Sequence, residues 1–182
     1  MREIPVHFAK ETGAADELVS RVHQAGDRAG LKWRETNYLL LQRGPYVIAS
    51  GLDESVSGAQ KVLKGRFIDL FDSKLAVQTS IRLDANHHFM LRDLDADRAR
   101  GPEVLESACK SLVLKKEAKF ISMAVEGVGD TPAVVLVRSS RPPRSITLEK
   151  ETISDFDYSA KDGLLWIRFM NESRPRTLSV QF

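Results

Sequence analysis

The chain has 182 residues, of which 42% are hydrophobic and 29% are charged, and its formal net charge is +2. These values are typical of soluble globular domains, and they exclude a disordered tail, a collagen-like fibre and a coiled coil. The near-neutral charge argues against a dedicated nucleic-acid-binding protein, and no apolar run is long enough to cross a membrane. Because Cys109 is the only cysteine, an intrachain disulfide cannot form, which excludes a disulfide-held secreted domain.

The two ends of the chain bear on its compartment. No apolar segment follows the basic residue near Met1, so the sequence predicts no signal peptide. A complete chain of this kind would be cytoplasmic, and the compartment is otherwise unknown. The first predicted helix begins close to the N-terminus and residues 178–182 have the pattern of a final strand. A fragment of a longer protein would look the same, with targeting information upstream.

Residues 12–30 carry the pattern of an amphipathic helix. Ala15, Leu18, Val19, Val22, Ala25 and Ala29 recur at spacings of three and four and make one apolar stripe. Thr12 can serve as the N-cap, and Gly30 is placed to end the helix.

The rest of the chain is rich in short apolar runs separated by turn residues. Apolar and polar residues partly alternate within these runs, which indicates one buried face and one solvent-exposed face, as in antiparallel sheets. Strands are expected near residues 38–41, 46–50, 62–69, 77–83, 89–92, 120–126, 133–138, 145–149, 153–158, 164–169 and 177–181.

Two further segments lie between these runs. Residues 102–108 predict a short helix that crosses between sheets. Lys110, Lys115, Lys116 and Lys119 fit the wet edge of a strand, because edge lysines discourage sheet-to-sheet aggregation.

These elements predict a mainly β protein, an antiparallel β-sandwich with a jelly-roll-like arrangement and one N-terminal helix. Regularly spaced short strands favour a sandwich or a barrel. We expect a helical arm over residues 1–35 and a β-sandwich domain over residues 36–182.

The sequence contains no catalytic signature, and we predict no cofactor and no metal site. His87 and His88 are adjacent, so on a strand they would point to opposite faces and could not easily bind one metal ion. The run from Asp93 to Asp97 lacks the glycine and the distal glutamate of an EF-hand loop. No glycine-rich phosphate loop precedes a helix.

Aromatic side chains offer a possible contact with sugars, because an apolar sugar face stacks on an aromatic ring. Trp33, Tyr38 and Tyr46 are the candidate carbohydrate-contact residues, and Trp33 is favoured because it lies in a polar linker. Core packing is the alternative for such residues.

Several sequence segments resemble the C-terminal β-sandwich regions that are appended to glycoside hydrolases. They span residues 37–49 (NYLLLQRGPYVIA), 63–72 (LKGRFIDLFD), 146–148, 156–158 and 163–169. The resemblance implies an accessory module, and the helix before Trp33 would then be the end of a catalytic barrel. No catalytic residue of such a family matches here.

The leading hypothesis is a non-catalytic β-sandwich module of a carbohydrate-active enzyme that packs on a covalently linked catalytic domain or contacts glycan. We expect no nucleic-acid or membrane partner. One alternative is a small enzyme with a carboxylate site drawn from Asp69, Asp72, Asp93 and Asp95. Another is a scaffold domain whose apolar helix face docks on a second protein.

Overall fold

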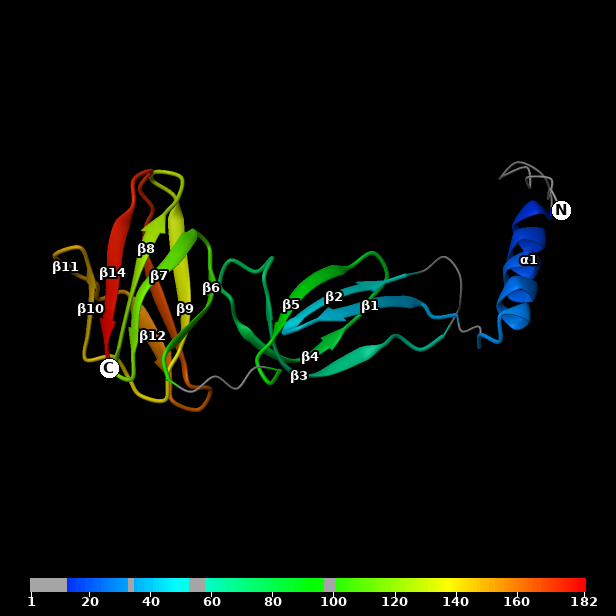
Figure 1. The fold of residues 1–182 in the computed structure, drawn as a ribbon, viewed down its shortest axis with the longest axis horizontal. Coiled ribbons are helices and arrows are strands. Elements are labelled where there is room, and N and C mark those ends of the chain that lie inside the picture. Colours follow the sequence, from blue (N-terminus) through cyan, green and yellow to red (C-terminus); the bar gives the residue numbers. More distant parts are fainter. Residues whose placement is uncertain (1–12, 33–34, 53–57, 97–100) are drawn as a thin grey trace.

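The computed structural model describes residues 13–32, 35–52, 58–96 and 101–182. The molecule is elongated: the helix lies at one end, a first sheet lies in the middle and two packed sheets form the other end (Figure 1). The elements are α1 (Ala14–Arg28), β1 (Tyr38–Arg43), β2 (Tyr46–Gly51), β3 (Val62–Asp69), β4 (Val77–Arg82), β5 (His88–Asp93), β6 (Glu103–Ser107), β7 (Lys110–Glu117), β8 (Phe120–Glu126), β9 (Pro132–Arg138), β10 (Ser145–Leu148), β11 (Glu151–Thr152), β12 (Phe156–Ser159), β13 (Leu164–Met170) and β14 (Arg176–Gln181).

The strands form three antiparallel sheets. Sheet A has the order β1-β2-β5-β3-β4, sheet B the order β12-β13-β9-β6 and sheet C the order β11-β10-β14-β8-β7. Sheets B and C pack face to face around a core that includes Met123, Val135 and Ile167, each with no exposed surface. This confirms the predicted mainly β sandwich with an N-terminal helix. The division of the chain at residue 35 stays a prediction.

Sheet A has a core of its own. Val47, Phe67, Ile81 and Leu91 are buried on one face of this sheet. The sheet curls so that the end of β2 meets the chain after β4: Gly51 makes an isolated bridge with Ala85. Because the buried face is turned inward, the opposite face of β1, β2 and β5 is the outer surface.

Strand β9 is buried on both of its faces. Val135 and Val137 face the core between sheets B and C, while Val134 and Leu136 belong to a second cluster that includes Ile68 from sheet A. Five consecutive residues of β9 are buried, which explains its nearly continuous apolar sequence. One end of sheet A, with the β3–β4 turn, therefore packs on the outer face of sheet B.

Helix α1 follows the prediction closely at its C-terminal end. Gly30 has φ +70, its N–H donates to Asp27 O and the N–H of Leu31 donates to Gly26 O. These two bonds form a Schellman motif. At the other end the N-cap is Gly13, without a side-chain cap, and Thr12 lies outside the described residues.

The predicted helix at residues 102–108 is wrong, because this segment forms strand β6. The register of β6 against β9 shifts between Val104 and Glu106, so Leu105 is an extra residue in the ladder. Leu105 enters the cluster shared with sheet A and Val104 packs against the sandwich core, because neighbouring residues of a strand point to opposite faces. Two adjacent apolar residues are thus buried in different places, which hides the strand pattern.

Strand β7 was not among the predicted strands, although its lysines indicated an edge. It is the last strand of sheet C and pairs with β8 alone. Lys110, Lys115 and Lys116 lie on it and are exposed, which confirms the predicted wet edge. The sequence obscured the strand because Leu112, Val113 and Leu114 form a run without alternation, and the register shifts between Val113 and Lys115.

Candidate functional site

The β3–β4 turn, residues 70–76, fastens sheet A to sheet B. Leu75 is 5% exposed and adopts φ 49, a left-handed conformation that is unfavourable for leucine. Its carbonyl oxygen accepts a hydrogen bond of 3.0 Å from Trp166 Nε1 on β13. The Asp72 carboxylate accepts bonds from the main-chain N–H groups of Lys74 and Ala76. These contacts hold the turn in the shape that inserts Leu75 between the sheets.

A groove of about 410 Å³ runs beside this turn. Its apolar lining includes Val134, Phe169 and Met170, and its polar lining includes Lys74, Asp155 and Arg168. A smaller hollow of about 190 Å³ adjoins it and shares Ser73, Ala108 and Val134. The volume lies in the range of small-ligand sites, which combine apolar surface with a few polar groups. We call the larger hollow the junction groove.

The charged rim of the junction groove is organised by Arg168. Its guanidinium lies 2.8 Å from Asp157 Oδ2 and 3.4 Å from Asp155 Oδ1. The hydrogen bond to Asp157, supported by Asp155, raises the pKa of Arg168 above its ordinary value. Arg168 therefore remains a cation, and the rim presents fixed donors and acceptors together.

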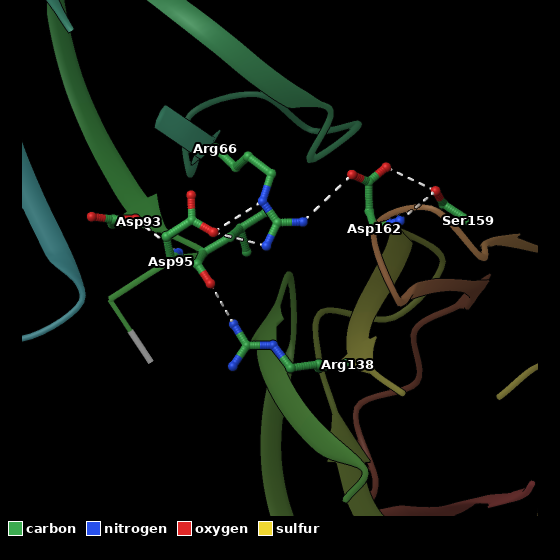
Figure 2. Close-up of polar contacts among 7 residues, drawn as sticks. Arg66, Asp93, Asp95, Arg138, Ser159 and Asp162 are labelled. Carbon is green, nitrogen blue, oxygen red and sulfur yellow. Dashed lines mark hydrogen bonds and ion pairs between the residues drawn. The ribbon is translucent and has the colours of Figure 1, made fainter. Parts of the chain in front are cut away.

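A second ion-pair group, at Arg66, joins sheet A to the sandwich (Figure 2). Arg66 donates from Nε and Nη2 to Asp95 Oδ1 at 3.0 and 2.8 Å, and its Nη1 lies 3.6 Å from Asp162 Oδ1. Ser159 Oγ holds Asp162 through a bond of 2.8 Å. The hydrogen bond to Asp95 is the largest of the effects that raise the pKa of Arg66. Arg138 of sheet B (Figure 2) donates from Nη2 to the main-chain oxygen of Leu94, the residue before Asp95, at 3.0 Å.

The four aspartates proposed for a carboxylate site all have structural contacts. The Asp69 carboxylate accepts a hydrogen bond from the main-chain N–H of Phe71, and the Asp93 carboxylate accepts one from that of Asp95. Asp72 holds the β3–β4 turn, and Asp95 pairs with Arg66. Such contacts shape turns and connect sheets.

Two of the three predicted carbohydrate-contact residues, Tyr38 and Tyr46, are described, and the structure does not bring these two together. Trp33 lies outside the described residues. Tyr38 and Tyr46 occupy opposite ends of the β1–β2 hairpin, opposite Gly51 and Arg43 respectively. Their role as glycan contacts stays a prediction.

Both tyrosines already contact cations. The Lys61 ammonium lies 5.6 Å from the centre of the Tyr38 ring, and the Arg92 guanidinium lies 5.3 Å from that of Tyr46. Arg92 also donates to the Tyr46 hydroxyl at 3.1 Å. Tyr46 thus supports the junction between sheet A and the sandwich.

Sequence reasoning missed the lining of the junction groove. Lys74 and Asp155 lie in turns, and Phe169 and Met170 end an ordinary apolar strand. One signal was present: Arg168 interrupts that strand with a charge, and its guanidinium is only partly exposed.

Two other observations limit the chemistry of the described part of the chain. Within it, no group of three or more His, Cys, Asp or Glu side chains is placed to hold a metal ion. No helix there is long and apolar enough to cross a membrane.

Asn171 begins an Asn-Glu-Ser glycosylation sequence, but its side chain serves the fold. The residue is 3% exposed, and its side-chain amide donates to Thr131 Oγ1. Attachment of a glycan there would require this buried contact to break.

Comparisons with known proteins show a partial structural likeness. No protein-family model matches the sequence, and no curated protein matches it. Two structures of a GH31 dextranase from Flavobacterium johnsoniae, one a mutant complexed with isomaltotriose and one complexed with glucose, are similar with a TM-score of 0.37. In each, the identity is 9%, and the match covers 76% of this chain and 26% of that chain. The fold and groove define a β-sandwich protein with a ligand-sized hollow between its sheets.

Proposed function

We propose that the chain is a non-catalytic β-sandwich module of a carbohydrate-active enzyme and that it contacts glycan at the junction groove. The observation that carries the proposal is the composition of this groove, which combines apolar surface with a charged rim. The sequence segments that resemble the modules appended to glycoside hydrolases also support a module of a carbohydrate-active enzyme.

The chemistry of the groove suits a neutral, hydroxyl-rich ligand. A sugar ring has apolar C–H faces and a periphery of hydroxyl groups, each of which both donates and accepts hydrogen bonds. Phe169 and Met170 supply apolar contact surface, while Asp155 supplies acceptors and Lys74 supplies donors. Arg168, already balanced by two aspartates, adds donors without a large net charge.

Binding to polysaccharides tests this proposal directly. The whole chain is incubated with insoluble glucans, chitin and xylan, and retention is measured by pull-down, with titration calorimetry on soluble oligosaccharides of the retained class. Asp155→Ala and Met170→Ala should each weaken binding about 5- to 30-fold, because each removes a contact worth roughly 1–2 kcal/mol. Lys150→Ala, an exposed lysine on the β10–β11 turn, is the matched control and should bind normally.

Two outcomes would contradict the groove as the glycan site. Retention of no polysaccharide by the unmodified chain would remove the glycan contact altogether. Normal binding by both groove variants together with loss in Trp33→Ala or Tyr38→Ala would move the contact to the residues predicted from sequence. Circular dichroism of each variant separates loss of binding from loss of fold.

A protein-interaction role is the second candidate, and one observation favours it. Helix α1 has a single buried residue, Ala14, although its sequence carries an apolar stripe. Val19 is 45% exposed and Val22 is 37% exposed. Its apolar face is therefore open to a partner.

A further inference from the structure

Two apolar surfaces near the N-terminal end of the molecule are exposed. The first is the stripe of helix α1, on which Val19 and Val22 are exposed by 45% and 37% and Leu18 is half-buried. The second is the outer strip of sheet A, which consists of Leu39, Leu41, Ile48 and Met90, exposed by 53%, 58%, 47% and 37%. Contiguous exposed apolar patches mark surfaces that bind other proteins.

The outer strip is a continuous surface because of the strand register. Leu41 lies opposite Ile48, and Ile48 lies opposite Met90, so one row of side chains crosses β1, β2 and β5. Leu39 lies two residues from Leu41 and therefore on the same face. The next residue of β5 on this face is Arg92, which is buried against the sandwich. The strip thus continues an interface that already exists within the chain.

The two surfaces match in size and in charge. From Leu18 to Ala25 the helix stripe is about 10 Å long at 1.5 Å per residue. Three neighbouring strands span about 10 Å across their backbones. Asp16 lies in the first turn of the helix, next to Glu17, which pairs with Arg21 of the same helix. The exposed Arg43 lies at one end of the strip, on the same face. A helix with its first turn over Arg43 would place opposite charges together.

The helix of the same chain is held away from the strip. His23 Nε2 lies 3.2 Å from Glu35 Oε1, which ties the helix to the segment that follows it. Asn37 then fixes that segment to sheet A, because its side chain donates to Gly58 O at 3.2 Å and its carbonyl accepts from Leu52 N at 2.9 Å. In Figure 1 the helix stands beyond the end of β1 and not over the face of the sheet.

We propose that this chain forms a reciprocal dimer in which helix α1 of each copy covers the outer strip of the other. The exchange buries both apolar surfaces of both copies without breaking the contacts of Glu35 and Asn37. A two-fold axis makes the two helix-on-strip contacts identical. None of the residues that line the junction groove belongs to the helix stripe or to the outer strip.

Sedimentation velocity over a concentration series tests the dimer. The unmodified chain should sediment as a dimer. Val22→Glu on the helix and Ile48→Glu on the strip should each sediment as a monomer, because each buries a charge in one of the two contacting surfaces. Val128→Glu, which changes a valine that is 74% exposed on the β8–β9 turn, is the matched control and should stay dimeric.

Mixing the two variants identifies which surfaces meet. A Val22→Glu chain keeps an intact strip and an Ile48→Glu chain keeps an intact helix, so the mixture can form one good helix-on-strip contact. It should therefore contain a heterodimer that neither variant forms alone. A dimer that persists in Val22→Glu would overturn the proposal in favour of strip-to-strip contact, and a monomeric unmodified chain would overturn it outright.

A disulfide cross-link distinguishes a helix that covers the strip of the other copy from one that covers the strip of its own chain. In a Val22→Cys, Ile48→Cys, Cys109→Ser chain, exchange predicts disulfide-linked dimers on a non-reducing gel. A disulfide within single chains would instead show the helix folded onto its own sheet and would contradict the proposal. Unchanged circular dichroism for every variant confirms that each one is folded.

Discussion

At the scale of single residues, Gly51 lies so close to the backbone of Asp84 that this position has no room for a side chain. A Cβ atom on Gly51 would lie 2.0 Å from the carbonyl oxygen of Asp84, well inside contact distance. Gly51 also donates its N–H to His87 O and accepts from Asn86 N. The end of β2 therefore touches the chain after β4 through backbone alone.

Gly51→Ala should destabilise the fold because the clash is with backbone and not with a movable side chain. We expect a loss of about 1–3 kcal/mol in the free energy of unfolding, measured by urea denaturation. Gly26→Ala is the control: no atom lies within 4 Å of its added Cβ, and alanine should stabilise the helix by about 1 kcal/mol. Equal stability of Gly51→Ala and the unmodified chain would contradict this contact.

The single cysteine is a second feature that acts at the residue scale. Cys109 is partly buried, and this burial raises the pKa of its thiol, although Ser107 and Arg176 act in the opposite direction. A raised pKa means less of the nucleophilic thiolate at a given pH.

Alkylation of Cys109 by iodoacetamide at pH 8 should therefore be slower in the folded chain than in the urea-unfolded chain. Mass spectrometry over time measures both rates. Ser107→Ala removes one of the groups that lower the pKa, so it should slow the folded-state reaction further. A folded-state rate as fast as the unfolded-state rate would contradict the effect of burial.

At the scale of elements, the local sequence pattern is sufficient to predict a helix or strand that has one buried face or a local stop signal. Strand β3 was predicted at its observed bounds, and the end of α1 follows from Gly30. Pattern was insufficient for β6 and β7, whose bulges interrupt the alternation of side chains. Where those bulges fall depends on how β6 pairs with β9 and how β7 pairs with β8, and neither strand shows this pairing in its own sequence pattern.

The β3–β4 turn depends on one long-range hydrogen bond. Trp166→Phe keeps an aromatic ring but removes the donor to the Leu75 carbonyl. Leaving this acceptor without its partner should cost about 1–3 kcal/mol in the free energy of unfolding. Phe156→Leu, a partly exposed position on the edge strand β12, is the comparison and should cost less. Equal losses in the two variants would contradict a role for the indole N–H.

At the scale of the whole molecule, buried charge links sheet A to the sandwich. The Arg92 side chain is 8% exposed and lies 3.0 Å from Glu106 Oε1, on β6. Arg92 also donates to Leu105 O and contacts the Tyr46 ring. One side chain from β5 thus holds β2 and β6 together.

Arg92→Ala should be strongly destabilising because it leaves Glu106 in a mostly buried position without its cation. We expect a loss of about 3–5 kcal/mol, measured by thermal and urea unfolding. Arg82→Ala removes an exposed partner of Asp84 and should cost less than about 1 kcal/mol. Arg92→Lys keeps the charge and should recover part of the loss. If Arg92→Ala were no worse than Arg82→Ala, the junction would not depend on this pair.

The sequence by itself determined the composition class, the amphipathic helix, most strands and the antiparallel sandwich. Each of these follows from short-range periodicity and turn chemistry. Only the tertiary structure decided that sheet A forms its own core, that β9 is buried on both faces and that Lys74, Asp155 and Arg168 meet at one groove. These features depend on contacts between residues far apart in the chain, such as Leu75 and Trp166. Local patterns show which face of a strand is apolar, but the packing of the sheets determines what covers it.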